Sequence, residues 1–185
     1  MPEKKYFFSQ TFANIKKILY LRRKYVIMCT VHSVADYIIT RIKCEGQSFL
    51  SNLKLQKLLY YTQAWHLGIH KQSLFDGEFQ AWIHGPVNRE LYDRFASNKD
   101  LYSEIELKDR IETNPSLTQR EKQFVDFILE NYAKFSATQL ERMTHNELPW
   151  KQARVGFGEY ERCEKKISQD LMKSFYGERW KKINA

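Results

Sequence analysis

The sequence predicts a mainly α-helical protein: a compact helical domain with a small antiparallel β element of two or three strands. Glycine and proline are scarce, with 7 and 4 of 185 residues, against usual shares of about 7% and 5%. Several segments repeat apolar residues at steps of three and four, as a helix with one buried face does. Hydrophobic residues make up 43% of the chain, which excludes a disordered protein and allows a sizeable core.

The first two helices of the domain are expected near Val31 and near residue 52. The first has apolar positions at Val31, Val34, Ala35, Ile38, Ile39 and Ile42, with Thr30 or Ser33 as its cap. The second is expected to begin after Ser51 or Asn52 and to run to about Leu67, where Gly68 can stop it. Because leucines and aromatic residues occupy most of its circumference, we expect this second helix at the centre of the fold.

A short strand is expected over residues 79–84. Phe79, Ala81 and Ile83 alternate there with Gln80, Trp82 and His84, a period of two. Gly85-Pro86 is expected to end the strand, and Asn88 to cap a helix over about residues 89–97. Ile105, Leu107 and Ile111 also share the period of two, which predicts a second strand that pairs with the first.

The C-terminal half is expected to be helical, apart from a turn at Pro149-Trp150. Capping boxes, Thr118-x-x-Glu121 and Ser136-x-x-Gln139, predict the starts of two helices. A last helix is expected from about Ser168, with Gly177 closing it. The expected division is an N-terminal extension over residues 1–30, one domain over residues 31–177 and a tail over residues 178–185.

The net charge of +8 is concentrated at the N-terminus. Residues 1–30 carry seven basic residues against Glu3, a net of +6, whereas residues 31–185 carry only +2. Three interpretations of the segment remain open: a helical appendage, a nucleic-acid-binding arm, or an upstream translation that precedes an authentic start at Met28. The nearly neutral body argues against a broad nucleic-acid surface there.

Three cysteines, Cys29, Cys44 and Cys163, are too few for a disulfide scaffold, so we expect a cytoplasmic protein. No apolar run approaches the roughly 20 residues that a membrane helix needs, so no membrane association is expected.

No pattern in the sequence indicates catalysis or a bound cofactor. His66 and His70 have a spacing that suits a shared metal ion, but no third ligand clusters with them, so we expect no metal site. Gly156-Phe157-Gly158 lacks the context of a phosphate-binding loop. The expectation is a non-enzymatic protein that binds no cofactor.

Several ordered motifs resemble one family. They are Lys54-Leu-Gln-Lys-Leu-Leu-Tyr-Tyr61, Ala64-Trp65-His66, Leu74-Phe75-Asp76, Ala81-Trp82, Gly85-Pro86-Val87, Glu90-Leu91-Tyr92, Thr144-His145 and Pro149-Trp150-Lys151. Together they resemble the Panacea domain of the SocA-like antitoxins, over roughly Val31 to Tyr176. The first thirty residues lie outside this resemblance.

The resemblance implies a bacterial or phage-encoded type II antitoxin. Such a protein neutralises a cognate toxin, encoded by a neighbouring gene, through direct contact and without catalytic residues or a cofactor. Two alternatives stay open: a phage-associated interaction protein or protease adaptor, and a nucleic-acid-binding regulator that uses the basic N-terminal segment.

The candidate partner-binding residues come from the strand, the central helix and the helix after Asn88. If Phe79, Ala81 and Ile83 face the core, Trp82 and His84 face outward, and Trp82 is the best single anchor. On the central helix, Lys54, Lys57 and Tyr61 are predicted to form an adjoining stripe, although the two lysines are equally well explained as a solvated edge. Tyr92 belongs to the same aromatic set.

Overall fold

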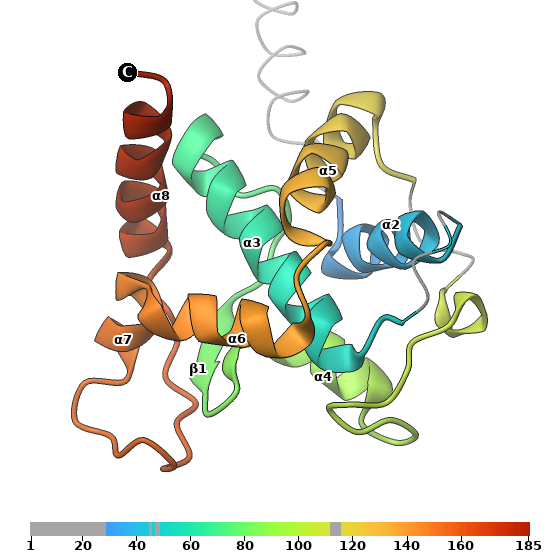
Figure 1. The fold of residues 1–185 in the computed structure, drawn as a ribbon, viewed down its shortest axis with the longest axis horizontal. Coiled ribbons are helices and arrows are strands. Elements are labelled where there is room, and N and C mark those ends of the chain that lie inside the picture. The colour runs from blue at the N-terminus through green and yellow to red at the C-terminus, as the bar shows by residue number, and fades with distance from the viewer. Residues whose placement is uncertain (1–28, 45, 47–48, 112–115) are drawn as a thin grey trace, which may run out of the picture.

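The computed structural model describes residues 29–44, 46, 49–111 and 116–185, so the expectations for the N-terminal extension lie outside the described residues. The described elements surround one central helix, α3 (Figure 1). In chain order they are α2 (Val31–Cys44), α3 (Asn52–His70), β1 (Phe79–Trp82), β2 (Gly85–Asn88), α4 (Arg89–Phe95), the 3-10 helix η1 (Leu107–Asp109), α5 (Gln119–Tyr132), α6 (Ala137–Asn146), α7 (Leu148–Ala153) and α8 (Gln169–Ile183). The predicted fold class, mainly helical with a small antiparallel β element, is confirmed.

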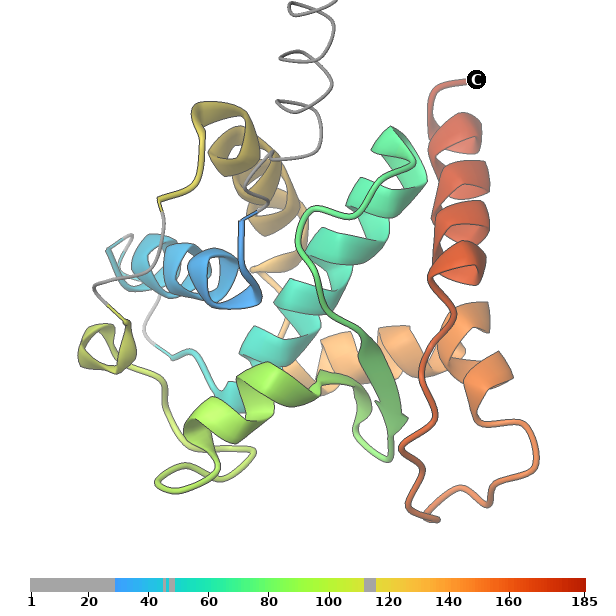
Figure 2. The same cartoon turned by 180° about the vertical axis from the view of Figure 1, so that it is seen from behind.

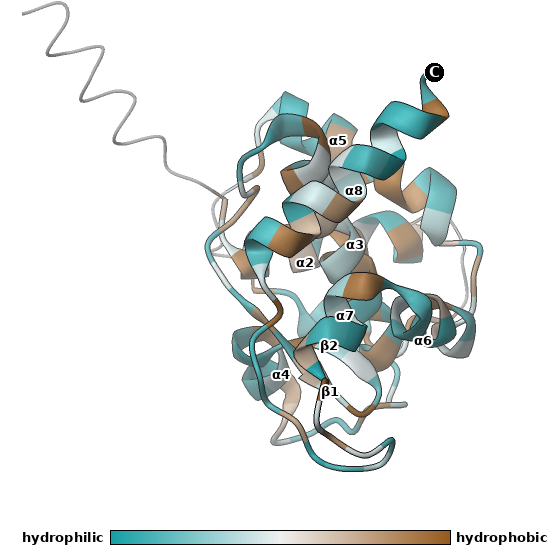
Figure 3. Ribbon diagram, turned by 90° about the vertical axis from the view of Figure 1, so that its left-hand side faces the viewer, coloured by the Kyte–Doolittle hydropathy of each residue, from teal (hydrophilic) through white to brown (hydrophobic). Residues whose placement is uncertain are grey.

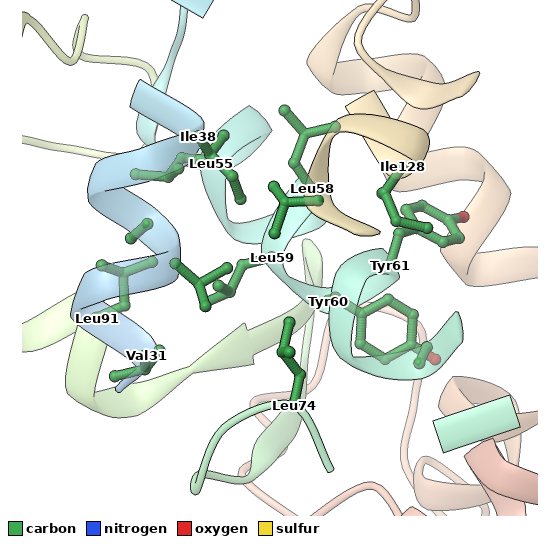
Figure 4. Close-up of a cluster of buried hydrophobic side chains, with 14 of the residues drawn as sticks. Val31, Ile38, Leu55, Leu58, Leu59, Tyr60, Tyr61, Leu74, Leu91 and Ile128 are labelled. Atoms are coloured by element: carbon green, nitrogen blue, oxygen red, sulfur yellow. The ribbon is translucent and has the colours of Figure 1, made fainter. Parts of the chain in front are cut away.

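Helix α3 is buried along nearly its whole length, as its apolar circumference predicts. Ser51 caps its start by accepting a hydrogen bond from the Lys54 backbone N–H at 3.2 Å. Side chains of α3 meet those of α2, α5 and the segments around the hairpin in one core, which Figure 4 shows. The helices around it are amphipathic, with hydrophobic and hydrophilic residues alternating along each ribbon (Figure 3).

The predictions that Gly68 and Gly177 end their helices are wrong, because both glycines lie inside continuous helices. Helix α3 continues to His70 and ends at Lys71, whose φ of 62° is left-handed. At Gly68 a Cβ atom would lie 2.6 Å from the Cβ of Tyr176 and 2.8 Å from the backbone N of Gly177. The two glycines therefore allow α3 and α8 to cross closely.

Strand β1 pairs with β2, not with residues 105–111 as predicted. Ile83 and His84 form a two-residue turn, and the chain returns at once along Gly85–Asn88, so Gly85-Pro86 starts a strand rather than ending one. Proline is tolerated because the backbone groups of Ala81, which lies opposite Pro86, bond outside the hairpin. Its N–H donates to the Lys165 carbonyl at 2.9 Å, and its carbonyl accepts from Arg154 Nη1 at 3.0 Å.

The predicted second strand is absent, and residues 107–109 form η1 instead. Ile105 is buried, and its backbone N–H donates to the Leu50 carbonyl at 2.8 Å, beside the start of α3. A different segment lies along the outer edge of β1: Lys166 bridges to Gln80 and the Ile167 N–H donates to the Phe79 carbonyl at 2.7 Å (Figure 2). Local alternation did not reveal this long-range pairing.

The predicted helix starts in the C-terminal half are confirmed, but two other expectations there are wrong. Thr118 and Ser136 open α5 and α6 through complete capping boxes, and Ser168 caps α8. Pro149-Trp150 is not a turn: it lies in the first turn of α7, where proline needs no hydrogen-bond donor. Residues 178–183 belong to α8 rather than to a tail.

All three cysteines are free thiols, with Cys29 and Cys163 buried and Cys44 exposed. Among the described residues, no helix has the length and apolar character needed to cross a membrane.

Candidate protein-binding groove

The β1–β2 hairpin is held in place from below by a buried lysine of α3. Lys57 is fully buried, and its Nζ donates to the Pro86 carbonyl at 2.9 Å. Gly85 has a φ of +89°, and a Cβ atom there would lie 2.8 Å from Cε of Lys57 and 2.7 Å from the Thr144 hydroxyl oxygen. Glycine at this position therefore lets the hairpin descend onto α3 and α6.

A groove of about 370 Å³ opens beside the tip of this hairpin. Its walls come from the hairpin, from α4 and from the segment that leads to α8, with the lining residues Trp82, Ile83, His84, Arg89, Tyr92, Arg162, Cys163 and Glu164. We call this the hairpin groove. Ile83 lines it as a half-buried turn residue rather than facing the core as predicted.

Two aromatic rings and an arginine form the centre of the hairpin groove. Trp82 and Tyr92 pack edge to face with ring centroids 4.7 Å apart. The guanidinium carbon of Arg89 lies 5.8 Å from the Trp82 ring centroid and 5.6 Å from that of Tyr92, in cation–π range. Because the Trp82 indole N–H donates to the Gln80 side chain at 2.7 Å, its polar group is satisfied without a partner.

The basic side chains that line this groove each lie beside an acidic one. Arg89 bonds Asp93 at 2.8 Å, His84 Nδ1 lies 2.9 Å from Glu141, and Arg162 contacts Glu164. The two arginine pairs are exposed, and exposed pairs contribute little to stability, about 0–1 kcal/mol each. A partner can therefore exchange them for its own charges at low cost.

Arg154 fixes the segment that closes the groove, and the sequence analysis missed it. The side chain is buried and donates to the carbonyl of Ala81 and, at 2.7–3.2 Å, to the carbonyls of Gly158, Glu159 and Glu161. Its guanidinium carbon also lies 5.1 Å from the Trp150 ring centroid. In the sequence, Arg154 follows the Pro149-Trp150-Lys151 motif by three residues, but nothing there indicates that its partners are loop carbonyls.

The structure brings together three of the six predicted partner-binding residues. Trp82, His84 and Tyr92 all line the hairpin groove. Lys57 and Tyr61 are fully buried, so the predicted surface stripe is wrong. The alternative prediction that Lys57 lies on a solvated edge is wrong for the same reason. Lys54 is half-buried and its Nζ donates to the Ala133 carbonyl at 2.6 Å.

Burial accounts for the perturbed pKa values of these α3 residues. Desolvation lowers the pKa of Lys57 to about 7, against an opposing effect of Glu141. Desolvation also raises the pKa of Tyr61, whose ring stacks on Tyr132 with centroids 4.2 Å apart. Lys57 and Tyr61 therefore belong to the interior of the protein, because the face of α3 that carries them is covered by other elements.

The histidine pair, His66 and His70, packs against an aromatic ring of α5. The rings of His66 and His70 lie 4.6 Å apart, and both pack against Phe124. His66 Nδ1 lies 2.7 Å from the Gln72 carbonyl. Within the described residues, no group of three or more histidine, cysteine or acidic side chains is arranged to hold a metal ion.

The hairpin groove gathers tryptophan, tyrosine and arginine, residue types that are enriched in protein–protein interfaces. The family described as "Antitoxin SocA-like, Panacea domain" matches residues 55–151, just over half of the chain. The chain belongs to this family, as the motifs in its sequence predict. The matched range contains the hairpin and α4, and therefore both aromatic residues of the groove.

A curated relative supports the same assignment. The chain is 31% identical over 113 residues to the protein named Antitoxin SocA from Caulobacter vibrioides (strain NA1000 / CB15N). The match covers 55% of this chain and 58% of that relative, so it spans less than two thirds of the relative's length. No solved structure matches the chain.

Proposed function

We propose that this chain is the antitoxin of a type II toxin–antitoxin system and neutralises its cognate toxin by direct protein–protein binding. Membership of the SocA-like antitoxin family supports the antitoxin role. The observation that carries the binding mechanism is the cluster in the hairpin groove of two half-buried rings, Trp82 and Tyr92, with the exposed Arg89. Tryptophan, tyrosine and arginine are the residue types most enriched in binding hot spots.

The hairpin groove suits a stable antitoxin surface because its support is rigid. Lys57 fixes the hairpin from below, Arg154 fixes the 158–161 loop, and Trp150 Nε1 donates to the Trp82 carbonyl at 3.1 Å. A preformed surface loses little conformational entropy when its partner binds. The proposed mode of action is therefore sequestration of the toxin, without catalysis.

Co-expression tests this function. We expect the product of a neighbouring gene to arrest growth when expressed alone, and the wild-type chain to restore growth. Trp82→Ala should abolish rescue with little change in melting temperature, because the supporting hydrogen bond from Trp150 goes to the Trp82 backbone. Tyr160→Ala is the matched control, since this ring is 80% exposed and does not line the groove.

Rescue that persists in Trp82→Ala places the toxin on another surface. A chain that fails to rescue growth from any neighbouring gene product is not an antitoxin of this type.

A further inference from the structure

A second groove, of about 520 Å³, lies where α5, α6 and the end of α8 meet over α3. We call it the α5–α8 groove. Its lining residues are Trp65, Phe127, Asn131, Tyr132, Phe135, Met143, Arg179, Trp180, Ile183 and Asn184. It shares no lining residue with the hairpin groove.

The α5–α8 groove exposes large apolar side chains. Phe127 is 40% exposed and Ile183 is 67% exposed, and the rings of Phe127 and Trp180 lie 6.4 Å apart across it. Contiguous apolar surface that is open to solvent and bordered by polar groups marks interaction sites in soluble proteins. The groove therefore has the composition of a docking surface.

Among the described residues, one charged side chain lines this groove, and it is basic. Arg179 is its charged lining residue, and the Lys134 ammonium lies 5.5 Å from the ring centroid of Phe135, a lining residue. No acidic side chain lines it among the described residues. Glu147 lies behind Arg179, buried and bonded to Tyr176 and to Arg179 Nη1, so it neutralises the inner side of the guanidinium.

Arg179 keeps capacity for a second anion. Its side chain is 45% exposed, and the described structure gives its guanidinium one carboxylate partner, through Nη1. The remaining N–H groups of an arginine suit a carboxylate in a forked geometry. A carboxylate of a partner can therefore bind the Arg179 guanidinium beside the aromatic residues that line the groove.

The shape favours a stretch of polypeptide. The lining residues run from Phe127 to Tyr132 on α5 and from Arg179 to Ile183 along α8, which is about 6–7 Å along each helix. A groove with walls longer than one helical turn accepts successive side chains of a segment, as in helix-in-groove recognition.

We propose that the α5–α8 groove binds an acidic, amphipathic peptide segment of a protein partner, with apolar side chains over Trp65, Trp180 and Ile183 and a carboxylate on Arg179. The α8 wall lies outside the matched family range of residues 55–151. Because the α5–α8 groove shares no lining residue with the hairpin groove, the inference does not depend on the proposed antitoxin function.

The basic segment of this chain suits the groove poorly. Residues 1–30 have apolar residues at Phe8, Phe12, Ile15 and Leu19, but a net charge of +6. Like charges at Arg179 and Lys134 disfavour its docking. An acidic partner segment has the complementary charge.

Peptide display tests the proposal and needs no purified partner. A random 12-residue peptide library is selected on the full chain and counter-selected on Ile183→Glu, which adds a negative charge at a largely exposed position. Selected peptides should combine large apolar residues with aspartate or glutamate. We expect the best synthetic peptide to bind wild type at least tenfold more tightly than Ile183→Glu, and its Glu→Gln counterpart to bind several-fold more weakly.

Val155→Glu is the matched control, because Val155 is 62% exposed and lies outside the groove. It should bind the peptide as wild type does. The proposal fails if no peptide depends on Ile183, if the selected peptides are basic, or if the Glu→Gln peptide binds equally well. It also fails if the wild-type chain is a dimer and Ile183→Glu is a monomer, because a second copy of the chain is then the occupant. It fails likewise if a chain that starts at Met28 binds the peptide far more tightly than the full chain, because the chain's own N-terminus is then the occupant.

Discussion

Lys57 illustrates at the residue scale how a binding surface depends on a side chain that no partner touches. Its ammonium group lies beneath the hairpin and donates to the Pro86 carbonyl, while Gly85 leaves the space that it fills. Among the charged groups around it, Glu141 favours the protonated form, whereas burial disfavours it more strongly. The net result is a pKa of about 7 in the folded protein.

This lowered pKa predicts a specific pH dependence of stability. The ordinary pKa of lysine is 10.5, so between pH 7 and 10.5 the unfolded chain binds a proton that folded Lys57 does not. The free energy of unfolding therefore rises with pH across this window, by up to about 1.4 kcal/mol per pH unit.

Lys57→Met should remove this contribution to the slope. Urea unfolding of both proteins between about pH 7.5 and 9.5 measures the difference, because the other titrating groups are common to both chains. Parallel pH curves for the two proteins would show that Lys57 stays charged when buried.

At the scale of elements, the contact between α3 and α8 depends on two glycines. The Gly68 backbone lies so close to Tyr176 and Gly177 that even a methyl group overlaps them. Aromatic side chains extend the contact, with the rings of Trp65 and Tyr176 5.1 Å apart and those of Tyr60 and Tyr176 6.4 Å apart. A change at Gly68 therefore affects the whole aromatic layer between the helices.

Gly68→Ala should lower the free energy of unfolding by about 1–3 kcal/mol, the usual cost of overpacking, despite the better helix propensity of alanine. Gly158→Ala is the control, because a Cβ atom there meets only Glu161 at an ordinary 3.7 Å. Urea denaturation of the two variants measures the effect. Equal stability of both variants would contradict the close crossing.

Arg154 joins α7 to the loop and to β1, and its planar group is needed for this. Arg154→Lys keeps the charge but cannot reach the same carbonyls together, so we expect faster amide hydrogen exchange in residues 156–166 and weaker toxin binding. Lys151→Arg, at an exposed position of α7, is the control. Unchanged exchange in Arg154→Lys would show that the loop is ordered by other contacts.

The elements that the sequence predicts well are those encoded locally. Capping residues and apolar periodicity identify the starts of α3, α5, α6 and α8 correctly. The errors occur where tertiary contacts decide: Gly68 and Gly177 serve a helix crossing, and Pro86 sits in a strand because Ala81 bonds elsewhere. For the same reason, the sequence identified Trp82, His84 and Tyr92 as candidates, which the structure places in one groove, but did not reveal that Lys57 and Tyr61 are enclosed.

At the scale of the whole molecule, charge and candidate binding surfaces are separated. Most of the net charge of +8 belongs to residues 1–30, whereas residues 31–185 carry +2. Both grooves lie in this nearly neutral part: Arg179 is the charged lining residue of the α5–α8 groove, and the hairpin groove is lined by Arg89, Arg162 and Glu164. This distribution of charge supports the proposed recognition of a protein over a broad contact of residues 31–185 with nucleic acid.

Calorimetric titration of the purified full chain with the toxic product of its neighbouring gene decides whether the hairpin groove binds a toxin. We expect saturable binding by the wild-type chain. Trp82→Ala should bind with at least tenfold lower affinity, a loss of about 1.4 kcal/mol in binding free energy, and Tyr160→Ala should bind as tightly as wild type. No binding by wild type, or equal affinities for the two variants, would contradict a toxin-binding surface at the hairpin groove.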